Sequence, residues 1–387
     1  MKIGISATEP SGDLLGAELI TALNQYSDVS LEFYGVGGNA MQTAGLKSLF
    51  NIEQLAVMGP VDFIAAIPRG YRLAKQLTRY LVEKDIDAMI VIDSPEFNHP
   101  VARWLRSRKK ELPIFDLVAP TVWAWRPWRA RKMKPYIDEV LAVLPFEPDV
   151  FKKLGGPLCT FIGHPAIDRA KRKNMSSTSF RQKHSISKEQ PVLLMLPGSR
   201  KGEITRHMAI FSQAVKSYCA QIENVCIVMP VIPHMKNEVS RHLKQLKLKV
   251  LLIEDEDEKW GAFRAADLAL AASGTVTLEL TATHTPMVVA YRVDRLAYLL
   301  RWLVNVHSVV LPNLIMQKNV VPEFLNKDCT PLALSTALIE LYRSDIVRTK
   351  QRDFLIEVTN EMGSSTSQET AERAAMVLIE RLKLKTF

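Results

Sequence analysis

The segment LALAA at residues 268–272 runs directly into SGTV at residues 273–276. The five apolar residues predict a fully buried strand, and the residues that follow predict a helix beginning beside it. A helix that starts on a Ser-Gly-Thr sequence presents free backbone N–H groups, a hydroxyl group and the positive end of its dipole. This strand-to-helix junction predicts an α/β fold with an anion-binding site.

The same junction carries residues suited to the phosphate and the ribose of a nucleotide. We expect Ser273, Gly274 and Thr275 to contact phosphate, whereas Glu279 lies one turn further on, where its carboxylate suits the two hydroxyl groups of a ribose. Phosphate and ribose together indicate a nucleotide. An ordinary capped helix without a ligand is the alternative that these residues alone leave open.

Length and composition indicate a two-domain globular protein. The chain has 387 residues, 47% of them hydrophobic, which exceeds the usual size of a single core. It has neither an apolar stretch of about 20 residues nor a signal-peptide pattern, so we expect a cytoplasmic protein. The four cysteines lack metal-type spacing and are expected to be reduced thiols.

The formal net charge of +9 is concentrated in one stretch. Such a basic face suits nucleic acid, an anionic membrane surface or a phosphorylated substrate, and a merely solvated surface is the alternative. The ten basic residues between positions 101 and 134, against two acidic ones, are Arg103, Arg106, Arg108, Lys109, Lys110, Arg126, Arg129, Arg131, Lys132 and Lys134.

Strand-like and helix-like segments alternate along the chain, which predicts parallel sheets with crossover helices. The expected strands are residues 2–7, 32–36, 88–93, 113–118, 139–144 and 160–163, then 192–196, 225–230, 250–253, 268–272 and 287–291. The expected helices are residues 14–25, 62–83, 98–110 and 148–154, then 204–220, 236–246, 259–265 and 276–283.

A polar stretch at residues 171–190 interrupts this alternation and predicts a linker. We therefore expect a Rossmann-like acceptor and lipid domain at 1–170, a Rossmann-like nucleotide-sugar domain at 171–350, and helices at 351–387 that return to the first domain. Parallel sheets bind ligands beyond the carboxyl ends of their strands, so two such domains are expected to face each other across a cleft.

In the first half, two strand ends carry candidate residues. The first expected strand is followed by Glu9, Ser11, Gly12 and Asp13, of which helix capping explains a part. No G-x-G-x-x-G sequence follows, which argues against NAD. The apolar strand before Asp93 would place that carboxylate in the cleft, where we expect it to act as a general base. A turn-capping role for Asp93, or Glu96 as the base, is the alternative.

Aromatic, apolar and basic residues gather in two further segments. The sequence WAWRPWR at residues 123–129 includes Trp123 and Arg126, which together could stack on bases, hold sugars or anchor an amphiphile. Apolar residues 55–68 precede Arg69, Arg72, Lys75 and Arg79, a pattern typical of an interfacial helix or an acyl pocket. Packing against the sheet is the alternative for the second segment.

The second half holds another anion-binding loop, LPGSR at residues 196–200. Gly198 and Ser199 permit close approach of the backbone, and Arg200 carries a guanidinium fork suited to a diphosphate. Near the end of this half, Asn313 supplies an amide side chain that could reach the sugar or the phosphate.

Nine collinear segments resemble the lipid-A-disaccharide synthase family of GT-B glycosyltransferases. They are EPSGD (9–13), AVMG (56–59), IDSP (92–95), VWAWR (122–126), LPFE (144–147), IGHP (162–165), LPGSR (196–200), SGT (273–275) and LPN (311–313). The resemblance covers the chain from one end to the other.

The resemblance implies an inverting transfer of 2,3-diacylglucosamine from UDP to 2,3-diacylglucosamine 1-phosphate, which yields a β-1,6 disaccharide 1-phosphate and UDP. It implies that Asp93 deprotonates the acceptor, with Glu9 and Asp13 near the reaction centre. It assigns Arg200 and the helix start at 273–275 to the diphosphate, Glu279 to the ribose and Asn313 to the donor. Substrate contacts are also expected at Ser11, Gly12, Trp123, Arg126, Gly198 and Ser199.

The resemblance also bears on cofactors and partners. Such GT-B enzymes lack a metal site and the loops of the expected cleft contain no Asp-x-Asp motif, so we expect neither metal nor cofactor. The expected partners are the UDP-diacylglucosamine donor, the phosphorylated diacyl-sugar acceptor, the anionic inner face of the cytoplasmic membrane, which would bind the protein peripherally, and a second copy of this chain as a homodimer. We expect no nucleic acid.

Three positions depart from the family pattern. They are Thr8 in place of Gly, Ala119 in place of Ser, and Val310 in place of Ser or Gly, and each could alter which sugar or acyl chain is accepted.

Two other functions stay open at this point. A UDP-sugar epimerase or another GT-B transferase would share the nucleotide loops but would leave the Trp-Arg cluster without a purpose. A basic nucleic-acid-binding protein would use the basic stretch but would leave Asp93, Arg200 and Glu279 without roles.

Overall fold

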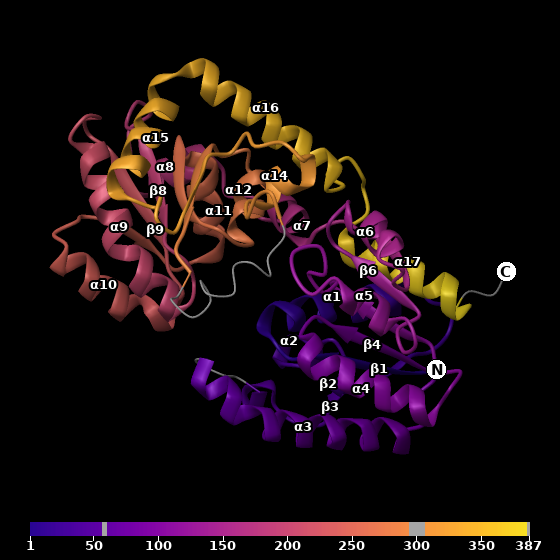
Figure 1. Ribbon diagram of the computed structural model, residues 1–387. Coiled ribbons are helices and arrows are strands. Elements are labelled where there is room, and N and C mark those ends of the chain that lie inside the picture. The colour runs from indigo at the N-terminus through magenta and orange to yellow at the C-terminus, as the bar shows by residue number, and fades with distance from the viewer. Residues whose placement is uncertain (56–59, 294–305, 385–387) are drawn as a thin grey trace. The chain divides into compact units, whose positions relative to one another are not determined.

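Each half of the chain builds its own parallel β-sheet covered by helices (Figure 1). The computed structural model describes residues 1–55, 60–293 and 306–384. The chain forms two compact units, of which the first contains Met1–Pro165 and Thr366–Phe387 and the second contains Ala166–Ser365. The segment AVMG at residues 56–59, expected from the family resemblance, lies outside the described residues.

The first unit contains a seven-stranded sheet in the order β3-β2-β1-β4-β5-β6-β7. Its central strand β4 (AMIVI) is buried at all five positions, as expected for a strand covered on both faces. The strands are β1 (Lys2–Ala7), β2 (Glu32–Val36), β3 (Leu46–Ser48), β4 (Ala88–Ile92), β5 (Ile114–Leu117), β6 (Glu139–Ala142) and β7 (Leu158–Phe161). The short edge strand β3 was not predicted.

Helices cover both faces of this sheet. Helices α3 and α4 pack against each other, whereas α1 packs against α17 (Figure 1). The helices are α1 (Pro10–Tyr26), α2 (Asn39–Thr43), α3 (Pro60–Glu83), α4 (Pro95–Arg108), α5 (Trp128–Met133), α6 (Glu147–Lys153) and α17 (Thr370–Leu382), and a 3₁₀ turn η1 spans Ile52–Leu55.

The last helix, α17, returns to the first unit as the sequence predicts. Its Glu372 accepts a hydrogen bond of 2.7 Å from the Tyr26 hydroxyl group on α1. Its Arg381 donates from Nε to Oε2 of Glu139 on β6 at 2.7 Å. Because Glu139 is almost fully buried, this ion pair helps to fix the helix on its own unit.

The second unit contains a six-stranded parallel sheet in the order β10-β9-β8-β11-β12-β13. The strands are β8 (Val192–Leu196), β9 (Cys226–Pro230), β10 (Leu251–Ile253), β11 (Leu268–Ala272), β12 (Met287–Tyr291) and β13 (Glu323–Leu325). The edge strand β13 was not predicted, because three residues carry little periodic signal.

The helices of the second unit also lie on both faces of its sheet. Residues of α9, α10 and α15 share one hydrophobic core with the strands, and α8 packs against α11 (Figure 1). The helices are α7 (Pro165–Arg172), α8 (Ser177–Lys183), α9 (Lys201–Cys219), α10 (Lys236–Gln245), α11 (Glu256–Ala265), α12 (Val276–Ala282), α14 (Leu311–Met316), α15 (Pro331–Arg343) and α16 (Asp345–Glu361), with a 3₁₀ turn η2 at Pro233–Met235.

Two expected boundaries are wrong. The stretch 171–190 is not a linker, because it forms α8, whose Phe180 is fully buried and whose Arg181 donates to the Ala265 carbonyl oxygen at 2.9 Å. Residues 351–365 do not join the first unit, because α16 packs against α12, α14 and α15 of the second.

Candidate active site

Each sheet contains one point where the strand order reverses, and several of the predicted site residues follow the strands on either side of it. The reversal lies between β1 and β4 in the first sheet and between β8 and β11 in the second. Open parallel sheets bind ligands beyond the carboxyl ends of their strands at such a switch point. Glu9 and Asp93 follow the first pair of strands, and Arg200 and Ser273 follow the second pair.

Asp93 lies directly after β4 in a left-handed backbone conformation, with φ of 52°, and Ser94 follows with φ of 46°. The Ser94 N–H group donates to Oδ1 of Asp93 at 2.7 Å, and the Asp93 N–H group donates to the Leu117 carbonyl oxygen at 2.9 Å. Two consecutive non-glycine residues in this region are unusual, and such strain is concentrated at functional sites. The conformation supports the predicted functional role of Asp93.

Left-handed conformations recur in the neighbouring loop, after β5. Val118 has φ of 73° and Arg126 has φ of 52°. A β-branched residue with positive φ is a genuine outlier, so the backbone that leads into the Trp-Arg segment is held by its surroundings. No sequence signal identifies Val118, because its conformation depends on contacts made by distant residues.

The Trp-Arg segment is half-buried at Trp123 and exposed at Trp128. Trp123 donates from Nε1 to Oε1 of Glu147 at 3.1 Å, whereas Trp128 is 52% exposed. The guanidinium group of Arg126 lies 3.9 Å from the ring centroid of Trp125, and that of Arg129 lies 5.7 Å from the same ring. These cation–π contacts fix a basic, aromatic surface, but substrate contact by Trp123 and Arg126 stays a prediction.

Glu147, which the sequence did not single out as a site residue, is a buried carboxylate beneath this segment. It is 2% exposed and accepts hydrogen bonds from Trp123 and from the Leu144 N–H group, the latter at 3.0 Å. Burial raises the pKa of Glu147 to about 7, against the opposing effect of the two donated hydrogen bonds.

This raised pKa predicts a measurable pH dependence of stability. Between the ordinary pKa of 4.5 and about 7, the folded protein keeps the Glu147 proton and the unfolded chain releases it, so the free energy of unfolding falls as pH rises. The contribution is about 3 kcal/mol at most. Denaturant unfolding at pH 5 and pH 7.5 should show this fall in the wild type but not in Glu147→Gln. Equal pH slopes in the two proteins would contradict it.

A second buried polar group lies behind Asp93. Nε2 of His99 on α4 lies 3.0 Å from Oδ2 of Asp116 on β5, and the Tyr136 hydroxyl group lies 3.3 Å from Nδ1 of His99. Burial raises the pKa of Asp116 and the negative charge of Asp93 adds to the effect, while His99 opposes it. His99, Asp116 and Tyr136 were not predicted from the sequence as a group.

Asp13, which the resemblance implies lies near the reaction centre, has a structural role in the loop before α2. Its carboxylate is 7% exposed and accepts backbone N–H groups of Gly38, Ala40 and Met41 at 2.7, 3.0 and 3.0 Å. Both oxygens are therefore used to hold the start of α2. Glu9 and Ser11 are exposed at the start of α1, and Gly12 is buried there.

In the second unit, the loop after β8 presents Arg200 to solvent. The Arg200 side chain is 81% exposed, with Nη1 4.0 Å from Oε1 of Glu203. Oε2 of Glu203 accepts the N–H groups of Ser199 and Arg200 at 3.1 and 3.3 Å. Gly198 has φ of 119°, and a Cβ atom at this position would lie 2.5 Å from Cβ of Glu203, so only glycine suits it. The guanidinium group of Arg200 is thus available to a phosphate. The N–H groups of Ser199 and Arg200 already donate to Glu203.

A buried histidine braces this loop. His207 on α9 is fully buried, with Nδ1 2.8 Å from the Pro197 carbonyl oxygen and Nε2 accepting the Arg292 N–H group at 3.0 Å. These partners require the neutral tautomer with the proton on Nδ1. Burial lowers the pKa of His207, consistent with a neutral ring. His207 could not be recognised from the sequence, because both of its partners are backbone groups.

The turn after β11 leaves backbone donors available. Ser273 donates from Oγ to the Val309 carbonyl oxygen at 2.6 Å, and Gly274 has φ of 151° with open space around it. Within the described part of the chain, the N–H groups of Gly274, Thr275 and Val276 donate no hydrogen bond. Gly274 and Thr275 are exposed, so these donors can meet a ligand.

Glu279 is held by an unpredicted partner. Its Oε1 lies 2.9 Å from Nζ of Lys259 on α11, and the side chains are 13% and 19% exposed. Lys259 also contacts Glu256 at 3.2 Å. One carboxylate oxygen of Glu279 is therefore engaged, and the ribose contact predicted for this residue would use the other.

The amide group of Asn313, predicted to contact the donor, is engaged by backbone groups of its own unit. The side chain is fully buried, and Oδ1 accepts the N–H groups of Val320 and Val321 at 3.2 and 3.0 Å. Its Nδ2 donates to the Val321 carbonyl oxygen at 2.9 Å. Asn313 closes the turn after α14, and its contact with the donor stays a prediction.

Comparison with known proteins shows which family the chain belongs to. A family model described as Lipid-A-disaccharide synthetase matches residues 3–377. The chain belongs to the lipid-A-disaccharide synthase family. Relatives named lipid-A-disaccharide synthase include those of Bradyrhizobium diazoefficiens, 40% identical, and Nitrobacter winogradskyi, 39% identical. The alignments cover 97% and 99% of this chain, and 96% of each relative.

Solved structures show the same fold at low identity. UDP-GlcNAc 2-epimerase from Neisseria meningitidis aligns with a TM-score of 0.65 at 13% identity, over 100% of both chains. MnaA from S. aureus aligns with a TM-score of 0.67 at 16% identity, over 100% of this chain and 98% of the other. The GT-B fold expected from the sequence, with two Rossmann-like units, is confirmed by these likenesses.

Two of the three departures from the family pattern are buried. Ala119 is 6% exposed and Val310 is fully buried, whereas Thr8 is half-buried at the end of β1. The buried pair therefore affects packing next to the site, and Thr8 is the departure nearest to its surface.

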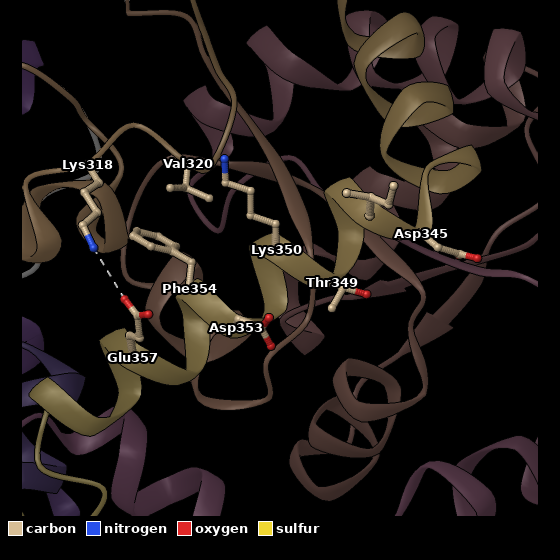
Figure 2. Close-up of a pocket in the computed structure, with 9 residues that line it drawn as sticks. Lys318, Val320, Asp345, Thr349, Lys350, Asp353, Phe354 and Glu357 are labelled. Carbon is tan, nitrogen blue, oxygen red and sulfur yellow. Dashed lines mark ion pairs between the residues drawn. The ribbon is translucent and has the colours of Figure 1, made fainter.

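The structure has a surface cavity that the loops after β1, β4, β8 and β11 do not line. A surface cavity of about 620 Å³ lies along α16, lined by Lys318, Val320, Asp345, Ile346, Thr349, Lys350, Asp353, Phe354 and Glu357 (Figure 2). It contains none of the predicted site residues. Among the described side chains, no group of three His, Cys, Asp or Glu residues could hold a metal ion.

Proposed function

We propose that this chain is an inverting glycosyltransferase that moves 2,3-diacylglucosamine from UDP to 2,3-diacylglucosamine 1-phosphate. The products are the β-1,6-linked disaccharide 1-phosphate and UDP. Family membership supports the reaction, and the observation that carries the site is the placement of the predicted residues at the switch points of both sheets.

In this proposal, Asp93 accepts the proton of the acceptor 6-hydroxyl group as its oxygen attacks the anomeric carbon of the donor. The bond from that carbon to the UDP oxygen breaks, and UDP leaves with the electron pair. The half-buried Asp93 at the end of β4 suits a general base. Glu9, Ser11 and Gly12, which follow the adjacent strand β1, are proposed to line the acceptor site.

The second unit is proposed to bind the UDP part. The exposed Arg200 guanidinium and the unused N–H groups at 274–276 would stabilise the charge that develops on the diphosphate. Glu279, oriented by Lys259, would accept the ribose hydroxyl groups. Gly198, Ser199, Trp123 and Arg126 are kept as proposed substrate contacts.

A product assay tests the proposed function. The protein is mixed with the diacylated UDP-sugar and the diacylated sugar 1-phosphate, and products are identified by mass spectrometry. We expect the disaccharide 1-phosphate and UDP in equal amounts, only when both substrates are present. Epimerisation of UDP-GlcNAc without any disaccharide would instead favour an epimerase.

We further propose that α3 contacts the anionic inner face of the cytoplasmic membrane. Ile67 and Tyr71 on this helix are 55% and 50% exposed, and Arg69, Arg72 and Arg79 are exposed beside them. Such a mixture of apolar and basic side chains suits a membrane interface. The described residues include no helix long and apolar enough to cross a membrane.

Ion pairs reduce the free charge of the basic stretch between residues 101 and 134. Arg106 lies 2.5 Å from Asp138, Arg129 lies 2.6 Å from Glu96, and Lys109 pairs with Asp85. In contrast, the structure as described gives Arg69, Arg72 and Arg79 no ion pair. The arginines of α3 are therefore proposed as a membrane contact beside the seven basic residues of 101–134 to which the described part of the chain gives no ion pair.

Replacing Arg69, Arg72 and Arg79 together with serine should reduce binding to anionic vesicles and leave UDP affinity unchanged. Each basic residue near such a surface contributes about 1 kcal/mol, and added salt should release the wild type. Replacing Lys216, Lys244 and Lys247, exposed on the second unit, with serine makes the same change in charge and should have little effect. A folded α3 variant that still sediments fully with vesicles would exclude this helix.

A homodimer stays a prediction. Light scattering coupled to size-exclusion chromatography would measure the mass of the protein in solution. A mass of twice the 43.6 kDa of one chain would indicate a dimer.

A further inference from the structure

The turn that presents Asp93 is strained, and one buried side chain holds it. Asp93 and Ser94 both have left-handed backbones, which persist only when the surrounding structure determines them. Asn98, one turn into α4, is fully buried and contacts the backbone of that turn.

The contacts of Asn98 satisfy its amide group on both sides. Nδ2 donates to the carbonyl oxygens of Asp93 at 2.8 Å and Ile92 at 3.0 Å, where β4 ends. Oδ1 accepts the hydroxyl group of Ser6 on β1 at 2.8 Å. Nδ2 also donates to the Ser6 carbonyl oxygen at 3.4 Å. Carbonyl acceptors on one side and a hydroxyl donor on the other fix the orientation of the amide.

This arrangement joins the two strands of the first switch point. Ser6 is fully buried, so Asn98 connects β1 and β4 without contact with solvent. An aspartate at position 98 would lack donors and would place a carboxylate against these carbonyl oxygens. An apolar residue would leave those oxygens without this donor.

We propose that Asn98 is a positioning residue that sets the direction of the Asp93 carboxylate toward the acceptor hydroxyl group. This inference rests on the proposed function, in which Asp93 is the base. Asn98 does not touch the substrate, and it acts by holding the backbone on both sides of Asp93 in the left-handed turn.

Asn98→Ala should lower kcat by about 10- to 100-fold, since a misplacement of about 1 Å costs about that much. The UDP dissociation constant should not change, because the proposed UDP contacts belong to the other unit. Combining Asn98→Ala with Asp93→Asn separates positioning from a general structural role. If Asn98 acts through Asp93, then Asn98→Ala should cause no further loss in the Asp93→Asn background.

Ser6→Ala provides a milder variant that keeps the three carbonyl acceptors of Nδ2 but removes the hydroxyl donor to Oδ1. It should cause a smaller loss of kcat, which also disappears in the Asp93→Asn background. Thr78→Val is the matched control, because the Thr78 hydroxyl group is similarly buried in the same unit but donates to the Ala74 carbonyl oxygen at 2.9 Å. It should lower thermal stability without lowering kcat.

Unchanged kcat in Asn98→Ala, or equal losses in the wild-type and Asp93→Asn backgrounds, would overturn the inference. If Asn98→Ala does not fold, Ser6→Ala decides the question by the same two criteria. A wild-type protein that forms no disaccharide would overturn the proposed function, whereas an active wild type with unaffected variants would overturn this inference alone.

Discussion

Replacing Asp93 with asparagine should lower turnover by about 10²- to 10⁴-fold, the usual cost of removing a general base. Asparagine keeps the size of the side chain, tolerates the left-handed conformation and can still accept the Ser94 N–H group that Asp93 accepts at 2.7 Å. The turn should therefore survive while the basic group is lost. Turnover is measured from product formation at saturating donor and acceptor, and UDP affinity by calorimetry should stay at the wild-type value.

Glu96→Gln is the matched control for this variant. Glu96 lies three residues further on, at the start of α4, and its carboxylate is paired with Arg129 at 2.6 Å. Its neutral variant should keep nearly wild-type turnover. Nearly wild-type turnover in Asp93→Asn would assign the base to another carboxylate, and Glu9 at the neighbouring strand end would then be the first to test.

Asp93 could be predicted from the sequence because its position depends on local patterns. A continuously apolar segment predicts a buried parallel strand, and the residue after it must lie at the carboxyl edge of the sheet. The same reasoning located the turn at Ser273 and the loop at Arg200. What the local pattern could not show is that Asp93 and Ser94 are both left-handed, or that Asn98 joins this turn to Ser6 on the neighbouring strand.

One physical circumstance bears on the roles predicted for Asp13 and Asn313, which stay predictions. Both side chains have polar atoms that could contact a ligand, and both use these atoms in hydrogen bonds to backbone groups of their own unit. Asp13 holds residues 25 to 28 positions further along the chain, and such contacts have no sequence signature. Family motifs mark positions that matter, but they do not separate residues that touch a ligand from residues that shape the loop around it.

Buried ionisable groups were not predicted from the sequence. Glu147, His99 and His207 look like surface residues by type, because charged and imidazole side chains are usually exposed. Each is buried and satisfied by partners from other elements. Their burial, and the pKa shifts of Glu147 and His207 that arise from it, follow only from the three-dimensional structure.

Replacing Arg200 with alanine should weaken UDP binding by about 10- to 150-fold. A charge-assisted hydrogen bond to a phosphate is worth about 1.5–3 kcal/mol, which corresponds to that range of dissociation constants. The guanidinium group is 81% exposed, so its removal should not disturb the loop. Glu203 would still hold the backbone N–H groups of residues 199 and 200.

Calorimetric titration of UDP into the wild type, Arg200→Ala, Arg200→Lys and Lys201→Ala distinguishes a specific contact from a general charge effect. Lysine keeps the charge but not the two-pronged geometry, so Arg200→Lys should fall between the wild type and Arg200→Ala. Lys201 is 76% exposed and lies 3.6 Å from Glu238, so Lys201→Ala removes the same charge beside the loop and should change UDP affinity little. Equal losses in Arg200→Ala and Lys201→Ala would indicate only long-range attraction, which added salt would screen. Unchanged affinity in Arg200→Ala would remove this residue from the diphosphate site and leave the N–H groups after β11 as its proposed donors.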